Sequence, residues 1–115
     1  MEPGRRKRID WLGDSRDVVR GFPDETRLAL GLELQLIQIG DSPAHWKPMK
    51  TVGSGVNELR IKQGDQYRVL YVAKFDEAVY VLHAFKKKTQ KTAKKDLDLA
   101  SARYQSLISW RNSNV

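Results

Sequence analysis

Three β-rich runs joined by very short connections occupy the middle of the chain. They cover residues 56–63, 66–75 and 78–86. Each gap is closed by two residues, Gly64-Asp65 and Asp76-Glu77. Connections this short join antiparallel neighbours and leave no room for a crossover helix. The chain therefore has to build an antiparallel meander, and its other segments have to pack on that sheet.

A helix is predicted before the meander, over residues 24–39. Its leucines alternate, which is also a strand-like period, but Leu, Ala, Glu and Gln are good helix formers. Asp24 fits the N-cap and Gly40 the C′ position. Gly31 inside the helix costs about 1 kcal/mol relative to Ala. A wide apolar face, buried against the sheet, is expected from Leu28, Leu32, Leu36 and Ile39 with Leu30, Leu34 and Ile37 beside them.

Shorter signals complete the N-terminal half. Ile9, Trp11 and Leu12 fit a short first strand. A helix begun by Asp14 or Ser15 is expected to end at Arg20, before Gly21 and Pro23. Residues 41–55 contain Pro and Gly breakers and predict a loop.

Residues 92–112 predict a C-terminal helix with Thr92 as its N-cap. Its apolar stripe consists of Leu97, Ala100, Tyr104, Leu107 and Ile108. At 115 residues the chain fits one domain, residues 9–112, after a basic flexible tail, residues 1–8. The expected class is α+β, with two N-terminal helices packed on an antiparallel sheet and a C-terminal helix.

The balance of charge is strongly positive. Lys and Arg number 21 against 14 Asp and Glu, a formal net charge of +7. Such an excess attracts anionic partners, and nucleic acid is a common one for a strongly basic domain. A domain that merely happens to be basic is the alternative, but charge favours binding to nucleic acid or the ribosome.

Residue types exclude several other classes of site. The chain has no Cys, which excludes disulfides, thiolate metal sites and a Cys nucleophile. His45 and His83 lie far apart without ligand spacing, so no metal or other cofactor is expected. No apolar run approaches the ~18 residues of a membrane span, and none follows the basic N-terminus as in a secretory signal. The expected location is the cytoplasm.

Three sequence blocks carry a family likeness. The first is His45-Trp46-Lys47-Pro48-Met49-Lys50 with Gly53-Ser54-Gly55-Val56 and Glu58-Leu59-Arg60. The second is Tyr67-Arg68-Val69-Leu70-Tyr71-Val72-Ala73, and the third runs from Val81 to Thr92. With these blocks in order, the chain from Ile9 to Leu107 resembles the phage-derived, HigB-like branch of the RelE superfamily, the toxins of type II toxin–antitoxin systems.

The resemblance implies a RelE-like microbial ribonuclease fold and an activity. The activity is that of a metal-independent, ribosome-dependent endoribonuclease, which cuts messenger RNA and inhibits translation. The implied partners are the ribosome, messenger RNA and a cognate antitoxin of the helix-turn-helix, HigA-like kind, bound in a hetero-oligomer. Ribosome dependence rests on the resemblance alone. The alternative function is a basic module that binds RNA or the ribosome without catalysis.

Two arginines are the first catalytic candidates. Cleavage without metal needs a base for the 2′-OH, an acid for the leaving 5′-oxygen and positive donors for the phosphorane-like transition state. Strand alternation puts Glu58, Arg60 and Lys62 on one face, and Arg68 interrupts an apolar strand. A guanidinium can grip two phosphate oxygens. The resemblance implies basic active-site residues at Arg60, Arg68 and the end of the last strand; a surface position or a structural pairing with Glu58 is the alternative.

The lysines that follow are expected to divide between two roles. Like charges close together lower one another's pKa, which would let Lys87 act as acid or base near neutral pH. Contacts to RNA phosphates are expected from Lys62, Lys86, Lys88, Lys91 and Lys94. A solvated run of charge is the alternative interpretation.

His83 is the fourth catalytic candidate. It is expected on the strand face of Val81 and Phe85, and its imidazole can act as acid or base, although a satisfied core histidine is the commoner case. Some relatives use a Tyr or His beyond the last strand, but residues 89–95 have neither, so the general acid is unassigned.

The tryptophans are expected to be packing residues. Trp46 could stack a base or dock its loop, and buried packing is the favoured interpretation. Trp11 and Trp110 are also expected to pack.

Overall fold

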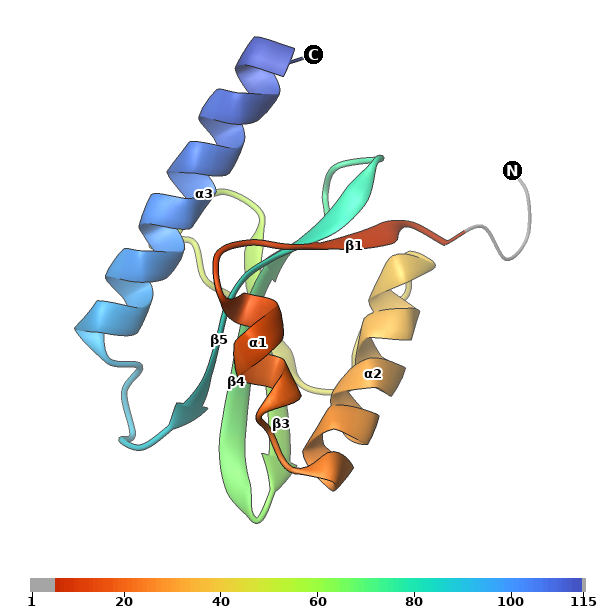
Figure 1. Cartoon of the computed structure of the whole chain (residues 1–115), viewed down its shortest axis with the longest axis vertical. Helices are drawn as coiled ribbons and strands as arrows, with labels where there is room; N and C mark the ends of the chain where they lie inside the picture. Colours follow the sequence, from red (N-terminus) through yellow and green to blue (C-terminus); the bar gives the residue numbers. More distant parts are fainter. Residues whose placement is uncertain (1–5, 115) are drawn as a thin grey trace.

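The computed structural model describes residues 6–114. Its strands are β1 (Arg8–Trp11), β2 (Trp46–Pro48), β3 (Val56–Gln63), β4 (Asp65–Val72) and β5 (Ala78–Lys87). Its helices are α1 (Ser15–Arg20), α2 (Asp24–Gln38) and α3 (Lys94–Asn114). The strands form one sheet in the order β1-β5-β4-β3-β2 (Figure 1).

The predicted meander forms, because β3 pairs antiparallel with β4 and β4 antiparallel with β5. β1 pairs in parallel with β5, so the sheet is mixed and the expectation of a purely antiparallel sheet is wrong in this detail. β2 lies inside the predicted loop and pairs with β3. Strands of four and three residues are too short to show a period in the sequence, so neither their pairing nor the existence of β2 was predictable.

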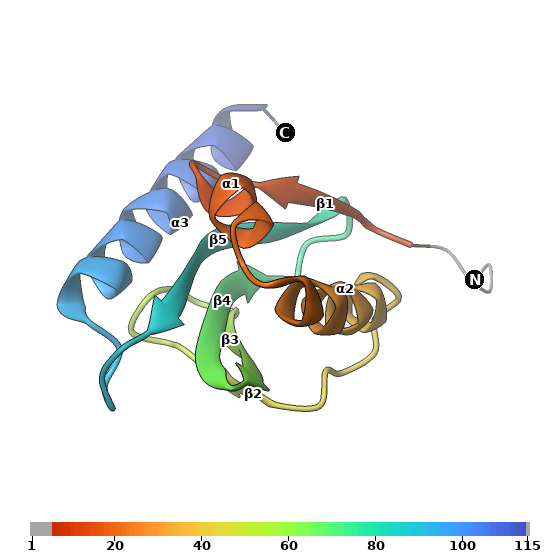
Figure 2. The same ribbon diagram turned by 60° about the horizontal axis from the view of Figure 1, so that its bottom comes forward.

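The helices cover both faces of the sheet (Figure 2). On one face α1 and α2 pack against β3, β4 and β5, with Leu30 and Leu34 of α2 in the same cluster as Val69. On the other face α3 buries Leu107 in a second cluster with Leu70. The α+β class is therefore confirmed, with the two N-terminal helices on one face and the C-terminal helix on the other.

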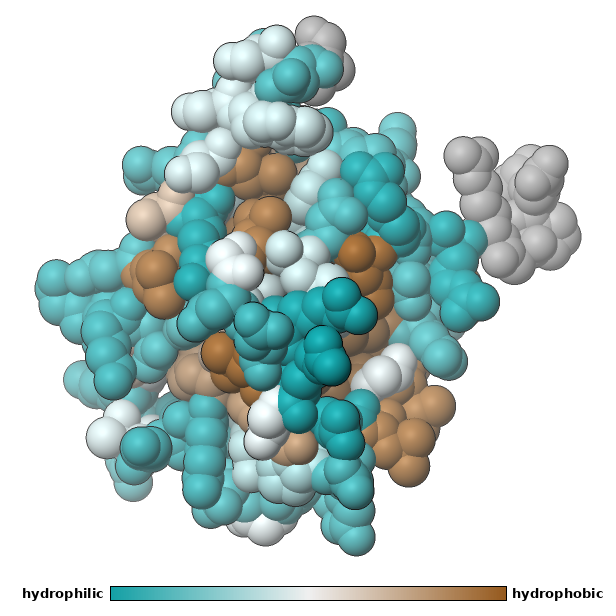
Figure 3. All heavy atoms as spheres, viewed as in Figure 1, coloured by the Kyte–Doolittle hydropathy of each residue, from teal (hydrophilic) through white to brown (hydrophobic). Residues whose placement is uncertain are grey.

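α2 buries only one of its two apolar stripes. Leu30 and Leu34 are 1% and 4% exposed, whereas Leu28, Leu32 and Ile39 are 68%, 57% and 52% exposed. Figure 3 shows apolar side chains at the surface on the side of the molecule where Figure 1 draws α2. The expectation that both stripes are buried is wrong, because a helix lying on a sheet buries only the stripe that faces it.

Helix ends match the sequence signals in part. Gly40 has a φ of +86° and its N–H donates to the carbonyl of Ile37, which confirms it as the C′ residue of α2. Pro23, and not Asp24, is the N-cap of α2. α3 begins at Lys94, so the expectation that Thr92 is its N-cap is wrong.

The tryptophans differ from one another. Trp11 is half-buried against the cluster under α2, as expected. Trp46 and Trp110 are 42% and 54% exposed, so their interpretation as packing residues is wrong. Exposed indoles were not predictable because Trp is among the most apolar side chains and usually packs.

The N-terminal residues that the structure describes take part in the fold. Arg8 begins β1, and the backbone N–H of Lys7 donates to the carbonyl of Gln38 at 3.0 Å. Residues 1–5 of the expected tail lie outside the described residues. No helix within residues 6–114 is both long and apolar enough to cross a membrane.

A β-bulge at Leu82 reverses the alternation of β5. Leu70 of β4 pairs with His83, but Tyr71 pairs with Val81, which leaves Leu82 as the extra residue. An extra residue moves the side chains that follow it to the other face. His83 therefore lies on the face opposite to Val81, and the expectation that they share a face is wrong.

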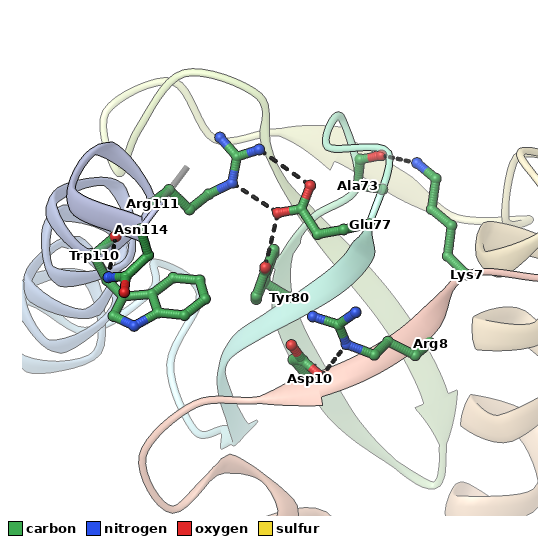
Figure 4. A network of polar contacts seen from close by, with 9 residues as sticks. All are labelled: Lys7, Arg8, Asp10, Ala73, Glu77, Tyr80, Trp110, Arg111 and Asn114. Atoms are coloured by element: carbon green, nitrogen blue, oxygen red, sulfur yellow. Dashed lines mark hydrogen bonds and ion pairs between the residues drawn. The ribbon is translucent and has the colours of Figure 1, made fainter.

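The last turns of α3 are tied to the β4–β5 turn by an ionic network (Figure 4). Arg111 donates from Nε and Nη2 to the carboxylate of Glu77 at 2.7 and 3.1 Å. The Tyr80 hydroxyl donates to the same carboxylate at 2.8 Å. Chiefly through the hydrogen bond from Arg111, the pKa of Glu77 falls from 4.5 to about 2.

Replacing Glu77 by Gln should destabilise the protein in a pH-dependent way. Since the pair is partly exposed, we expect a loss of only about 1 kcal/mol at neutral pH. Because the folded-state pKa is depressed, the contribution is complete above pH 4.5 and is lost as pH falls toward about 2. Urea unfolding of both proteins across this range should give curves that converge at acid pH, and equal stabilities at neutral pH would contradict the role of the pair.

Candidate functional site

On the face away from α1 and α2, nine of the side chains that the meander presents form three neighbouring rows across β3, β4 and β5. The first row is Lys62, Gln66 and Lys87. The second row is Arg60, Arg68 and Phe85. The third row is Glu58, Leu70 and His83. The bulge in β5 brings the three β5 residues onto this face, since strict alternation from Val81 would have turned them toward α2.

A buried carboxylate holds the two arginines together. Arg60 and Arg68 are direct partners across β3 and β4, where like charges repel. Glu58 is 0% exposed, and its Oε1 lies 3.1 Å from Arg60 Nε and 3.5 Å from Arg68 Nε. The hydroxyl of Thr92 donates to Oε2 at 3.3 Å. One carboxylate therefore offsets two guanidinium charges and fixes their direction.

Arg68 is the more deeply buried of the two arginines. It is 5% exposed, and it donates from Nη1 to the carbonyl of Tyr67 at 3.1 Å and from Nη2 to Gln66 Oε1 at 2.5 Å. Its Nε has no hydrogen-bond partner within the described residues. Burial lowers the pKa of Arg68, against the opposing effect of Glu58. A guanidinium has five N–H donors, so donors remain for an anion.

The arginines line an open hollow of about 410 Å³, called here the arginine hollow. Its lining residues are Ala44, His45, Trp46, Arg60, Lys62, Gln66 and Arg68. Arg60 presents a side chain that is 38% exposed. The segment that leads into β2 borders the hollow and is joined to β3, because the N–H of Arg60 donates to the carbonyl of His45 at 2.9 Å. The hollow can take a phosphate-sized anion and a group attached to it.

Lys87 stands beside this hollow in the first row, across from Gln66. Its pKa is lowered, first by burial and then by Arg68, with Glu58 acting in the opposite sense. The expected direction of this pKa shift is therefore found, but its cause differs from the expected repulsion among lysines.

The other predicted lysines are spread over several surfaces. Lys62 lines the arginine hollow. Lys86 points to the opposite face and pairs with Asp65 at 2.9 Å, which raises its pKa. Lys94 pairs with Asp98 at 2.9 Å on α3. The remaining two, Lys88 and Lys91, are exposed beyond β5.

His83 lies under α3 and not in the arginine hollow. Its Nε2 is 2.7 Å from Asp96 Oδ1, its Nδ1 is 3.4 Å from Arg103 Nη1, and its ring stacks on Phe85. The side chain is 8% exposed. The structure thus brings Arg60, Arg68 and Lys87 together on one face and engages both ring nitrogens of His83 elsewhere.

Sequence reasoning missed three residues of the site. His45 and Gln66 line the arginine hollow, and Thr92 reaches Glu58 from the segment before α3. Alternation had placed Glu58 beside Arg60, and the structural pairing of the arginines with Glu58, given as an alternative, is found in the structure. No sequence signal identifies Thr92 or His45, because each reaches the site through a long-range contact.

Residue types and comparisons with known proteins define the site further. Within residues 6–114 no group of three or more His, Cys, Asp or Glu could hold a metal ion.

The model of a family described as phage derived protein, Gp49-like, matches residues 17–105, which is more than half of the chain. The matched stretch includes all nine side chains of the three rows. No curated protein matches the chain.

Removing the buried carboxylate of Glu58 should lower the free energy of unfolding. Glu58→Gln leaves two opposed arginines without a counter-charge, and we expect a loss of about 3 kcal/mol of unfolding free energy. Adding Arg68→Met should recover part of that loss, because the two changes remove an interacting pair. Urea unfolding of the single and double variants measures the coupling, with Glu25→Gln on the exposed start of α2 as the control. Strictly additive losses would contradict a Glu58–Arg68 interaction.

Proposed function

Because the chain belongs to the Gp49-like family of phage-derived proteins, a family of the RelE/HigB-type toxin group, we propose that it is the toxin of a type II toxin–antitoxin pair, of the HigB-like branch, and cuts messenger RNA. The single observation that carries the proposal is the pair of arginines opposed across β3 and β4 at the arginine hollow. Like charges in direct opposition weaken a sheet, whereas two neighbouring guanidinium groups suit the binding of a phosphate.

The two arginines act as a phosphate clamp in this proposal. Cleavage joins the 2′-oxygen to phosphorus and breaks the bond from phosphorus to the 5′-oxygen, which leaves a 2′,3′-cyclic phosphate and a 5′-hydroxyl. Negative charge builds up on the non-bridging oxygens in the transition state, and fixed guanidinium groups stabilise it. Glu58 orients both arginines before the substrate arrives, so little reorganisation is needed.

Proton transfer in this proposal falls to groups around the arginine hollow, without a metal ion. Lys87 has a pKa lowered by burial and by Arg68, which makes it a better proton carrier than an ordinary surface lysine. His45 lines the hollow and is the second group able to carry a proton. His83 takes no part in this scheme, because Asp96 and Arg103 engage its two ring nitrogens.

The proposed partners follow from the toxin–antitoxin assignment and from charge. A cognate antitoxin, of the helix-turn-helix HigA-like kind, binds the toxin in a hetero-oligomer. The ribosome supplies the translated message in the cytoplasm, and Lys62, Lys88 and Lys91 are exposed for contacts with RNA phosphates. Lys86 and Lys94 are expected to contribute less, since each already has a carboxylate partner.

A basic RNA-binding module without catalysis is the second candidate. The observation that favours it is the engaged state of His83, which removes one of the two histidines from proton transfer. A cleavage assay with purified ribosomes and a translated message separates the two functions. New 3′ ends support the endoribonuclease, and ribosome binding without new 3′ ends supports the module.

Loss of the clamp should abolish most cleavage. We expect Arg60→Ala, which removes the more exposed arginine, to lower the cleavage rate by ~10²-fold or more, as removal of a transition-state donor commonly does. Arg68→Lys keeps the charge but loses the planar fork and should also be strongly impaired. Arg20→Ala, an exposed arginine at the end of α1 on the opposite face, is the matched control and should cut like the parent. Parental rates in both the Arg60 and the Arg68 variants would show that the clamp is misassigned.

The pH dependence should identify the proton carriers. If Lys87 is the base, the cleavage rate rises with pH up to its lowered pKa; if it is the acid, the rate falls above that pKa. Lys87→Arg keeps a positive charge that does not titrate, so the change of cleavage rate with pH that is due to Lys87 should disappear. Lys88→Arg, which changes an exposed lysine beyond β5, should leave the profile unchanged. A Lys87→Arg profile identical to that of the parent would contradict the assignment.

A further inference from the structure

Lys47 of β2 lies on the same face of the sheet as the two clamp arginines. Its Cα partner is Glu58 of β3, and directly paired residues point to the same face, so Lys47 shares the face of Arg60. Its side chain is exposed. The carboxylate of Glu58 is already shared by Arg60 and Arg68, and within residues 6–114 no other carboxylate pairs with Lys47. The ammonium group of Lys47, with three N–H donors, is therefore available to a ligand.

Lys47 and Lys87 occupy opposite positions around the clamp. The sheet order puts β5 one strand beyond β4 and β2 one strand beyond β3 (Figure 2). Lys87 is in the first row of side chains, and Lys47 extends the third row onto β2. Each lysine is thus displaced from the neighbouring arginine by one strand, about 4.8 Å, and by two residues along the strand, about 6.7 Å, in opposite directions. A line from Lys87 to Lys47 therefore passes between Arg60 and Arg68.

The rest of the third row is closed to a ligand. Glu58, Leu70 and His83 are 0%, 0% and 6% exposed. Leu70 packs in the cluster under α3, and Asp96 holds the ring of His83. Of the four side chains in this row, Lys47 alone is exposed. A substrate held by the clamp meets a cation at this end only on β2.

The charge of Lys47 reaches across the clamp. Burial and then Arg68 lower the pKa of Lys87 most, and Lys47 lowers it as well. Water and salt weaken the effect of one surface charge on another as their distance grows. The two ammonium groups are therefore close enough to act on one bound phosphodiester.

Cleavage by the 2′-oxygen needs proton carriers on opposite sides of the phosphorus. The attacking 2′-oxygen and the leaving 5′-oxygen lie roughly in line through the phosphorus. The base that activates the 2′-OH therefore stands at one end of this line, and the acid for the 5′-oxygen stands at the other. With the phosphate between Arg60 and Arg68, these two ends are the positions of Lys87 and Lys47.

We propose that Lys47 is the general acid, which protonates the leaving 5′-oxygen while Lys87 takes the proton of the 2′-OH. This inference rests on the proposed function for the reaction itself. The bond from the 2′-oxygen to phosphorus forms, and the bond from phosphorus to the 5′-oxygen breaks. One proton passes from the 2′-OH to the amine of Lys87, and another passes from the ammonium of Lys47 to the 5′-oxygen. The products are a 2′,3′-cyclic phosphate and a 5′-hydroxyl, and proton exchange with water returns both lysines to their starting forms.

A linkage with sulfur in place of the leaving 5′-oxygen tests the proposal. A thiolate leaves without being protonated, because thiols are much stronger acids than alcohols. In a short synthetic message on purified ribosomes, Lys47→Ala should cut the ordinary linkage ~10²-fold or more slowly than the parent, the typical contribution of a general acid. The same variant should cut the 5′-sulfur linkage at nearly the parental rate. Equal impairment on both linkages, or parental rates on both, would overturn the acid role.

Lys47→Arg separates proton donation from simple attraction of the phosphate. Arginine keeps the positive charge but does not give up a proton, so this variant should be slow on the ordinary linkage and should recover on the 5′-sulfur linkage. A parental rate on the ordinary linkage would show that only the charge matters and would overturn the proposal. Arg60→Ala should be slow on both linkages, because the clamp acts on phosphate oxygens that are present in both. Arg20→Ala, exposed at the end of α1, should match the parent on both.

Recovery on the 5′-sulfur linkage also identifies a competing acid. His45 lines the arginine hollow, and recovery of His45→Gln without recovery of Lys47→Ala would make the histidine the acid. Recovery of Lys87→Arg in place of Lys47→Ala would exchange the roles of the two lysines. Either result contradicts the proposal.

Failure of this inference differs from failure of the proposed function. If the parent produces new 3′ ends but Lys47→Ala does not recover on the 5′-sulfur linkage, the endoribonuclease stands without Lys47 as its acid. If the parent produces no new 3′ ends on either linkage, the RNA-binding module replaces the enzyme and the acid role of Lys47 is wrong with it.

Discussion

The buried carboxylate of Glu58 is the interaction on which the site depends. Two arginines face each other across β3 and β4, an arrangement that costs energy in any sheet. Glu58 lies between them with no exposed surface, so the attraction acts in a medium with little water to screen it. The same contact that makes the pair tolerable also fixes both guanidinium groups at the edge of the arginine hollow. The stability of the sheet and the arrangement of the two guanidinium groups are therefore coupled at one residue.

The bulge at Leu82 decides which side chains join that site. Without it, Lys87 would project toward α2 and away from Arg68. One extra residue in β5 reverses the alternation, puts Lys87 beside Gln66, and puts His83 where Asp96 and Arg103 can hold it. The burial of Lys87 and the nearby arginines then lower its pKa, so a single irregularity of one strand determines both the position and the chemistry of this lysine.

Prediction from sequence succeeded where the signal was local. The meander followed from two short turns, and strand alternation placed Glu58, Arg60 and Lys62 on one face, whereas the register that brings Arg68 opposite Arg60 came from the structure. It failed for the strand face of His83, because a bulge leaves no mark in the order of apolar residues, although His83 is the buried, hydrogen-bonded histidine that was the commoner expectation. It also failed for Thr92, whose hydroxyl reaches Glu58 instead of capping a helix. It failed for Trp46 and for Leu28 as well, because hydrophobicity does not reveal which side chains the fold leaves exposed.

The sequence by itself determined the antiparallel meander, the positive charge, the helical segments and the residues that can grip a phosphate, because each depends on residue type and short spacing. Tertiary structure decided the parallel pairing of β1, the existence of β2, the buried position of Glu58 and the face taken by Lys87. These features depend on which distant segments meet, and a contact between residues far apart in the sequence leaves no local pattern from which it could be predicted.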